Sequence, residues 1–165
     1  MPSGGAGGGN PTRRTRGRVL ACRPMDAPRE VWGDLATTAF VESSLLFRSL
    51  DPDALRDLVQ LARAVDAAAG ETVSAEDDDG FYLLMDGRAE VLAGGEALGQ
   101  LERGACFGEG RVLGGGRPAA LVARTAVTAV AFPAPMVAAM AERFPRLRKL
   151  LEAARAARQK AVHGA

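Results

Sequence analysis

The spacing of apolar residues along the chain changes from helical to strand-like and then back to helical. The first regular helical pattern covers residues 52–63, where four apolar residues recur at i, i+3, i+4 and i+7: Leu55, Leu58, Val59 and Ala62. Asp51 is a candidate N-cap for this helix, and Pro52 fits its first position. We therefore expect a helix here that turns one apolar stripe toward a core.

A less regular helical pattern precedes this helix, over about residues 28–46. It predicts an N-terminal helical segment within residues 25–44. Five of its apolar side chains are expected to be buried: Val31, Trp32, Leu35, Ala39 and Leu45.

After residue 63, short apolar segments alternate with turn signals at intervals of about 8–12 residues, which is typical of a β-sandwich or barrel. The expected strands are residues 81–85, 88–92, 97–101, 120–123 and 127–132. Asp86-Gly87 and Gly94-Gly95 separate the first three strands, and such pairs favour tight hairpins because glycine accepts a positive φ. Residues 45–146 thus predict a mainly β domain of the α+β class, a jelly-roll or double-stranded β-helix flanked by N- and C-terminal helices.

Helical spacing returns after Pro133. Met136, Val137 and Met140 predict a short helix, and Pro145 opens a second helix, which occupies the C-terminal segment, residues 147–165. The expected apolar stripe of this last helix is Leu147, Leu150, Leu151, Ala154 and Ala161. Four charged residues are expected to face solvent: Arg146, Arg148, Glu152 and Arg155.

Charge is distributed unevenly along the chain. The 165 residues have a net charge of +1, but residues 1–24 hold five arginines and no acid. Subtracting this +5 leaves −4 for the remainder, which does not favour a body that binds nucleic acid through a basic surface. Residues 1–24 are rich in Gly, Pro and Arg, and we expect them to be disordered. A contact with nucleic acid or an acidic membrane is one interpretation of this tail. We favour the interpretation that it is an untranslated upstream stretch or a vector-like leader, with Met25 as the true start.

The cysteines and the N-terminus favour a cytoplasmic protein. Residues 19–22 resemble a lipoprotein cleavage box, and Arg13-Arg14 resembles a twin-arginine start, but the apolar stretch of about 7–15 residues that both require is missing. Cys22 and Cys106 indicate no disulfide framework, which favours a reducing compartment. We expect no membrane partner.

Residues 105–120 hold the candidate ligand site. Glu109 lies between Gly108 and Gly110, and Arg117 follows a run of three glycines. Glycines let backbone N–H groups approach an anion closely, and a guanidinium grips phosphate oxygens in a fork. A carboxylate accepts hydrogen bonds from a sugar hydroxyl. The combination suits a phosphate attached to a ribose.

Several motifs in order along the chain resemble the cyclic nucleotide-binding domain family, over about residues 45–147. They are the first helix motif at 46–51, the Gly-Glu strand at 69–73, the hairpin at 82–91, the Phe-Gly-Glu turn at 107–109 and the final helices after residue 132. Relatives in this family include the regulatory subunits of cyclic-AMP-dependent protein kinase and the catabolite-activator transcription factors. The resemblance implies a β-roll with a phosphate-binding cassette.

The resemblance implies seven ligand-binding residues: Phe107, Gly108, Glu109, Gly110, Arg117, Ala119 and Ala120. Gly108 matches the glycine whose N–H faces the ligand, Glu109 the acceptor of the ribose 2′-hydroxyl, and Arg117 the phosphate-gripping arginine. The family's arginine is followed by a residue whose N–H also binds the phosphate, but Pro118 has no N–H. One such bond is worth about 1.5–3 kcal/mol, or roughly 10–100-fold in affinity. Weakened binding and no binding therefore both stay open.

Structural roles are the alternatives for these residues. Glu109 would cap its own turn and pair with Arg117, and Arg117 would otherwise be a solvated loop residue. We expect Cys106 to be a small buried hydrophobic residue, and the acidic residues 76–79 to form a solvated turn in place of a calcium loop. His163 is the only histidine, which argues against a histidine-based triad or zinc site. We expect that the protein is not an enzyme and that it binds neither a metal nor a cofactor.

The function that we expect is a stand-alone regulatory module that senses a cyclic nucleotide, cyclic AMP by analogy, and acts on an unidentified protein partner. The alternative is a degenerate module that serves as an interaction or oligomerisation scaffold, with a homodimer through the alanine-rich C-terminal helix. A DNA-binding regulator is the least favoured, because such relatives append a winged helix and this chain ends at Ala165.

Overall fold

The computed structural model describes residues 29–31, 34–115 and 117–164, with the side chains of 30–31, 34–115 and 117–158. The predictions for residues 1–24, for Trp32 and for Ala161 fall outside what it describes.

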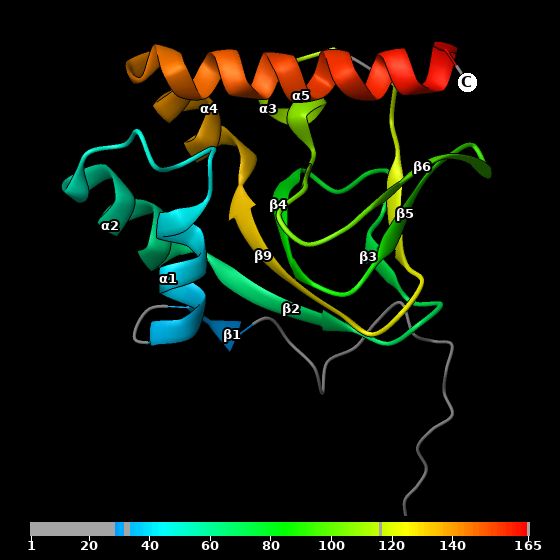
Figure 1. Cartoon of the computed structure of the whole chain (residues 1–165), viewed down its shortest axis with the longest axis horizontal. Helices are drawn as coiled ribbons and strands as arrows, with labels where there is room; N and C mark the ends of the chain where they lie inside the picture. Colours follow the sequence, from blue (N-terminus) through cyan, green and yellow to red (C-terminus); the bar gives the residue numbers. More distant parts are fainter. Residues whose placement is uncertain (1–28, 32–33, 116, 165) are drawn as a thin grey trace, which may run out of the picture.

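Two antiparallel sheets form the centre of the molecule (Figure 1). The first sheet has the order β1 (Arg29–Glu30), β2 (Arg63–Ala67), β9 (Val127–Pro133), β4 (Gly80–Asp86) and β7 (Cys106–Phe107). The second has the order β3 (Thr72–Ser74), β8 (Ala120–Ala123), β5 (Ala89–Ala93) and β6 (Glu96–Leu101). This arrangement confirms the predicted mainly β, α+β class, and each of the five predicted strands is present within one or two residues.

Strand β4 shows how the two faces of the first sheet are used. Tyr82 and Leu84 belong to the cluster of side chains between the sheets, which also contains Val91 of β5 and Leu121 of β8. Because successive side chains of a strand point to opposite faces, the alternate residues Phe81 and Leu83 face the helices. Burial on both faces explains why β4 reads as a nearly continuous apolar run.

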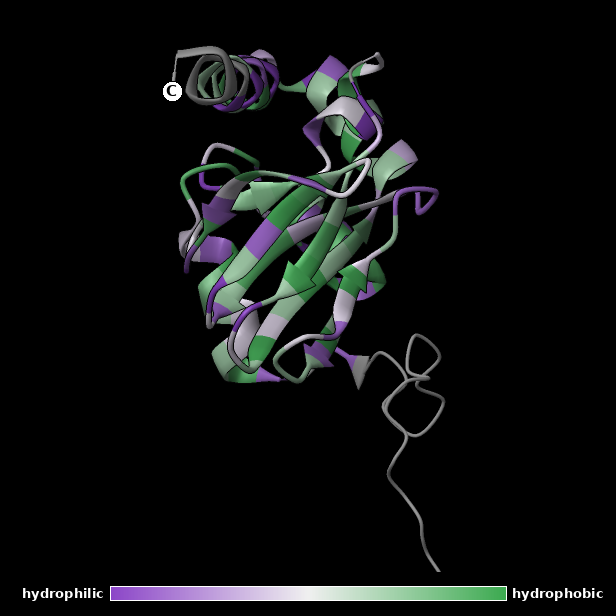
Figure 2. Ribbon diagram, turned by 90° about the vertical axis from the view of Figure 1, so that its right-hand side faces the viewer, coloured by the Kyte–Doolittle hydropathy of each residue, from purple (hydrophilic) through white to green (hydrophobic). Residues whose placement is uncertain are grey.

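Within the residues that the structure describes, five helices accompany the sheets: α1 (Leu35–Ser43), α2 (Pro52–Leu61), α3 (Glu109–Leu113), α4 (Ala134–Arg143) and α5 (Pro145–Gly164). Phe47, Phe81 and Phe132 pack with ring centroids 5.2–6.5 Å apart at the centre of the cluster beneath the helices. The strands at the centre of the molecule are mostly hydrophobic (Figure 2). None of the helices in the described ranges is long and apolar enough to cross a bilayer.

The local signals for α2 and the first hairpin are confirmed. The carboxylate of Asp51 accepts the N–H of Ala54 at 2.8 Å, and Leu58, Val59 and Ala62 are buried. Gly87 joins β4 to β5 with φ of 89°. A Cβ atom at Gly87 would lie 2.1 Å from the carbonyl oxygen of Ala126, so only glycine fits this turn.

Helix α1 presents a different face from the predicted one. Val31 is buried as expected, but Leu35 is 84% exposed, Leu45 is 69% exposed and Ala39 is exposed. Thr37 and Val41, which are four residues apart, face the core instead. Thr37 can be buried because its hydroxyl donates to the N-cap carboxylate of Asp34 at 2.7 Å. The prediction for Leu35, Ala39 and Leu45 is therefore wrong, because the helix packs on the core with the face that carries Thr37 and Val41.

Candidate functional site

A cavity of about 450 Å³ lies between strands β5 and β6, the segment 107–119 and helix α5. This volume falls within the range of about 300–1,000 Å³ typical of small-molecule sites. Its apolar lining residues are Val91, Leu98, Phe107, Pro118 and Ala119. Its charged lining residues are Glu76, Asp78, Glu109, Arg111, Arg117, Arg155 and Arg158. Gly108, Gly110 and Gly115 complete the wall.

Six of the seven predicted ligand residues line this one cavity, and Ala120 does not. Ala120 opens strand β8, where it pairs with Leu92 of β5 in the sheet ladder, so it belongs to the sheet and not to the wall. The predicted cluster from Phe107 to Gly110, with Arg117 and Ala119, is brought together by the fold.

The pairing of β7 with β4 positions the start of the cassette. Phe107 lies opposite Tyr82 in this pairing, and the chain then turns at Gly108 with φ of 104°. A Cβ at Gly108 would lie 2.7 Å from the carbonyl oxygen of Gly80. Glycine is therefore required both by the backbone conformation and by the close approach to β4. Helix α3 begins at the next residue, Glu109.

Glu109 is a buried acid whose partner comes from the far end of the chain. Its side chain is 2% exposed, and its Oε1 lies 2.7 Å from Nη1 of Arg158 on α5. Nη2 of Arg158 donates to the carbonyl oxygen of Cys106 at 2.7 Å. A buried carboxylate without a cation would be costly, so this pair ties α5 to the beginning of the cassette.

A second arginine of α5 reaches the other end of α3. Nη1 of Arg155 donates to the carbonyl oxygen of Gly114, which caps the helix, at 2.9 Å. The prediction that Arg155 faces solvent is wrong, and Arg158 was missed. The signal lay in the helical spacing, because Arg155 and Arg158 follow the buried Leu151 by four and seven residues and so share its face. Figure 1 shows α5 lying across α3.

Arg117 lines the cavity, and its guanidinium contacts residues of the β5–β6 hairpin. Its Nη2 lies 3.3 Å from Oε1 of Glu96 on β6 and 3.4 Å from the carbonyl oxygen of Ala93. The alternative in which Glu109 pairs with Arg117 is wrong, since each has a different partner.

Arg111, which was not predicted as a site residue, fixes the inner wall. Its Nη1 donates to Oγ of Ser74 at 2.8 Å and to the carbonyl oxygen of Gly80 at 2.9 Å. Its Nη2 donates to the carbonyl oxygens of Ala75 at 2.9 Å and Ala119 at 3.1 Å. The guanidinium lies 5.0 Å from the ring centroid of Phe107. Four protein acceptors thus tie α3 to the segments around β3, β4 and β8.

Asp78 departs from the expected solvated turn. It is half-buried and accepts hydrogen bonds from the hydroxyls of Tyr82 and Ser74 and from the N–H of Gly80. Burial alone would raise the pKa of Asp78, but these hydrogen bonds and the charge of Arg111 together lower it. The burial of Tyr82 itself, and then the neighbouring Asp78, raise the pKa of the Tyr82 hydroxyl. Glu76, Asp77 and Asp79 are exposed, as expected of a turn.

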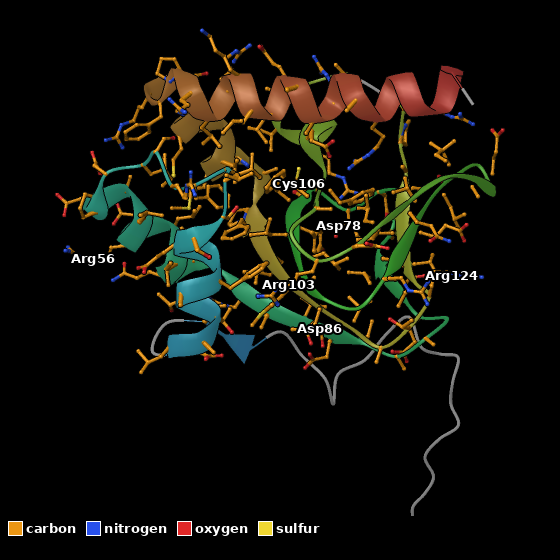
Figure 3. All side chains as sticks on the ribbon, in the orientation of Figure 1. Arg56, Asp78, Asp86, Arg103, Cys106 and Arg124 are labelled. Carbon is orange, nitrogen blue, oxygen red and sulfur yellow. The ribbon has the colours of Figure 1, made fainter. Side chains whose placement is uncertain are left out.

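Cys106 is a buried thiol, as predicted. Burial first, and the charge of Glu109 second, raise its pKa to about 12, against the opposing charge of Arg158. The thiol is therefore protonated at neutral pH. Figure 3 shows Cys106 beneath α5 and Asp78 further down among the strands. Among the side chains that the structure describes, no group of three His, Cys, Asp or Glu could hold a metal ion.

Comparison with known proteins points to one family. Residues 64–144 match the cyclic nucleotide-binding domain. No curated protein matches the sequence.

Solved structures share the fold at low sequence identity. The cAMP-bound protein PfPKA-R (141–441) is similar at 17% identity with a TM-score of 0.64, over 79% of this chain and 46% of that one. The sensor domain of the transcriptional regulator DNR from Pseudomonas aeruginosa is 19% identical with a TM-score of 0.64, over 73% and 91%. The regulatory subunit of a cAMP-independent protein kinase A from Trypanosoma brucei is 16% identical with a TM-score of 0.52, over 58% and 38%. This chain spans less than half of the PfPKA-R chain that it resembles.

Proposed function

We propose that this cavity binds a cyclic nucleotide, with cyclic AMP as the first candidate, because residues 64–144 match the cyclic nucleotide-binding domain. The observation that carries the proposal is the convergence of Glu109, Arg117 and the apolar residues Val91 and Leu98 on one cavity. An acid, a guanidinium and an apolar wall are the groups that suit a ribose, a phosphate and a purine respectively.

The proposed binding mode assigns one part of the ligand to each group. Arg158 engages Oε1 of Glu109, and Oε2 is the oxygen that we propose accepts the ribose 2′-hydroxyl. Arg117 would turn from Glu96 to the phosphate. Since Pro118 offers no N–H, Arg117 supplies most of the phosphate grip from its own segment. Ala119 and the start of α3 would close the site around it.

The proposed output of binding is a change in α5. Arg155 and Arg158 hold the two ends of α3, so a ligand seated against α3 acts on the contacts that position α5. A ligand shifts such an equilibrium by its difference in affinity for the two positions. We propose that a protein partner reads the position of α5 and that the domain acts by binding and not by catalysis, in a cytoplasmic setting.

Isothermal titration with cyclic AMP tests this proposal. We expect saturable heat for the wild type and at least about a ten-fold weaker association for Arg117→Ala, because a hydrogen bond to a charged oxygen is worth about 1.5–3 kcal/mol. Arg124→Ala is the matched control, since Arg124 makes an ion pair of the same 3.3 Å length but does not line the cavity. No heat with millimolar cyclic AMP would contradict the proposal.

A second function is favoured by the pairing of the charged groups. Glu109, Arg111 and Arg117 all have protein partners, and Pro118 removes a donor, as in a domain kept for its shape alone. This scaffold would form an oligomer, for example a homodimer through α5, whose mass in light scattering does not change with cyclic AMP or with Arg117→Ala. Recovery of cyclic AMP binding in Pro118→Ala alone would identify it as a decayed sensor.

A further inference from the structure

The tip of the hairpin between β5 and β6 holds Arg117. Nη2 of Arg117 contacts both the side chain of Glu96, at 3.3 Å, and the carbonyl oxygen of Ala93, at 3.4 Å. The tip is itself fixed to the wall of the cavity, because the N–H of Gly94 donates to Oε2 of Glu76 at 2.9 Å. Glu96 therefore presents a carboxylate to the one arginine that the ligand's anionic group would need.

The contacts of Arg117 are more easily replaced by contacts with a ligand than are those of Arg111 and Arg158. Arg111 is held by four acceptors from three parts of the chain, and Arg158 pairs with a carboxylate that is 2% exposed. By contrast, Arg117 and Glu96 are 56% and 69% exposed. Exposed ion pairs shift an equilibrium constant by only up to about five-fold. The Arg117–Glu96 pair is thus an ion pair that a ligand can displace.

We propose that Glu96 is a specificity-determining residue that competes with the ligand's phosphate for the guanidinium of Arg117. The proposal rests on the proposed function of the same cavity. When the ligand is absent, the Glu96 carboxylate neutralises Arg117; when a phosphate ester enters, the guanidinium exchanges one anion for the other. The competition weakens binding of ligands that carry an anionic group and leaves the binding of their uncharged counterparts unchanged, since these make no demand on Arg117.

The test is titration of Glu96→Gln with cyclic AMP and with adenosine, which has the base and the ribose but no phosphate. Glutamine keeps the shape of the side chain and removes its charge. We expect cyclic AMP to bind about two- to five-fold more tightly than to the wild type, and adenosine affinity to be unchanged. In an Arg117→Ala background the same substitution should have no effect, because the contested guanidinium is gone.

Glu90→Gln is the matched control. Glu90 lies on β5 of the same hairpin and pairs with Arg124 at 3.3 Å. The substitution therefore removes an ion pair of equal length without changing a residue that lines the cavity. Arg124 lies at the end of the β-roll away from α5 (Figure 3). We expect the affinity of Glu90→Gln for cyclic AMP to equal that of the wild type.

The outcomes separate this inference from the function on which it rests. If Arg117→Ala weakens cyclic AMP binding but Glu96→Gln does not strengthen it, the inference is wrong and the proposed function stands. An equal gain for adenosine would also overturn it, because the effect would not depend on charge. Absence of binding to the wild type and to Glu96→Gln at millimolar cyclic AMP would reject the proposed function and this inference with it.

Discussion

The arginines around the cavity differ in role because their acceptors differ. Arg111 uses both Nη atoms on Ser74 and three backbone carbonyls, and so serves the architecture of the wall. Arg117 has one long ion pair and one long backbone contact, and so is available to exchange partners. Sequence spacing predicted Arg117 as a site residue. Residue type alone could not distinguish an arginine that holds the structure together from one that can change its partner.

Asp78 should contribute to stability in a way that depends on pH. Because its pKa in the folded state is lower than its ordinary value of 3.8, the ionised form favours folding. This contribution is complete above the unfolded-state pKa, near pH 4, and is lost as the pH falls through the lower folded-state pKa. We therefore expect Asp78→Asn to lose less stability than the wild type between about pH 5 and pH 2, measured by urea unfolding at each pH.

The neighbouring exposed residue Asp77 provides the control for this measurement. Asp77→Asn should leave the difference in unfolding free energy between pH 5 and pH 2 close to that of the wild type. If Asp78→Asn and the wild type lose stability in parallel on acidification, the hydrogen-bonded role of Asp78 is wrong.

At the scale of elements, α5 is anchored to α3 by charged groups and to the core by apolar ones. Leu147 and Leu151 are buried, and Arg155 and Arg158 continue the same face over the cassette. The apolar part of this face followed from the periodicity of the sequence. The charged part did not, because the partner of Arg158 lies 49 residues away along the chain and is brought next to it only by the tertiary fold.

Replacing Arg158 should loosen the cassette strongly. Arg158→Met leaves Glu109 buried without a cation, and breaking a fully buried pair costs about 3–5 kcal/mol. Because Arg158 is 23% exposed, we expect a loss of about 2–3 kcal/mol in the free energy of unfolding, measured with urea. Amide hydrogen exchange of α3 should become faster in the same variant.

Arg148→Met is the matched substitution on the same helix. Arg148 pairs with Glu152 at 3.1 Å on the exposed side, and such i,i+4 pairs contribute about 0.3–0.5 kcal/mol. Equal losses for Arg148→Met and Arg158→Met would contradict an anchoring role for the Arg158–Glu109 pair.

The contrast between α1 and β4 shows what sequence patterns can and cannot decide. In β4, four buried residues in succession and Gly87 at the turn define the strand, so its prediction needed no tertiary information. In α1, the apolar residues Leu35 and Ala39 share one face, but Thr37 and Val41 share the face that meets the core. The choice depends on how the short helix docks, and the Asp34–Thr37 hydrogen bond makes the polar choice possible.

At the scale of the whole molecule, two sheets and the helices around them enclose one site made from distant parts of the chain. The β5–β6 hairpin contributes Val91, Leu98 and the competing Glu96, the cassette contributes Glu109 and Arg117, and α5 closes the opposite side. The order of motifs predicted the roll and most of the wall. It could not predict the ion pairs across the cavity, since each joins elements whose relative placement is set by packing.

Mapping cyclic AMP onto the labelled protein by amide NMR is the most direct test of the central claim. Titration should shift the resonances of residues 107–111, 117, 119, 155 and 158, together with Val91 and Leu98, because these residues line the cavity (the proline at 118 has no amide signal). Resonances of α1 and α2, on the other side of the first sheet, should be unchanged. Saturating shifts elsewhere on the molecule, or no shifts at millimolar cyclic AMP, would contradict the assignment of this cavity as the cyclic nucleotide site.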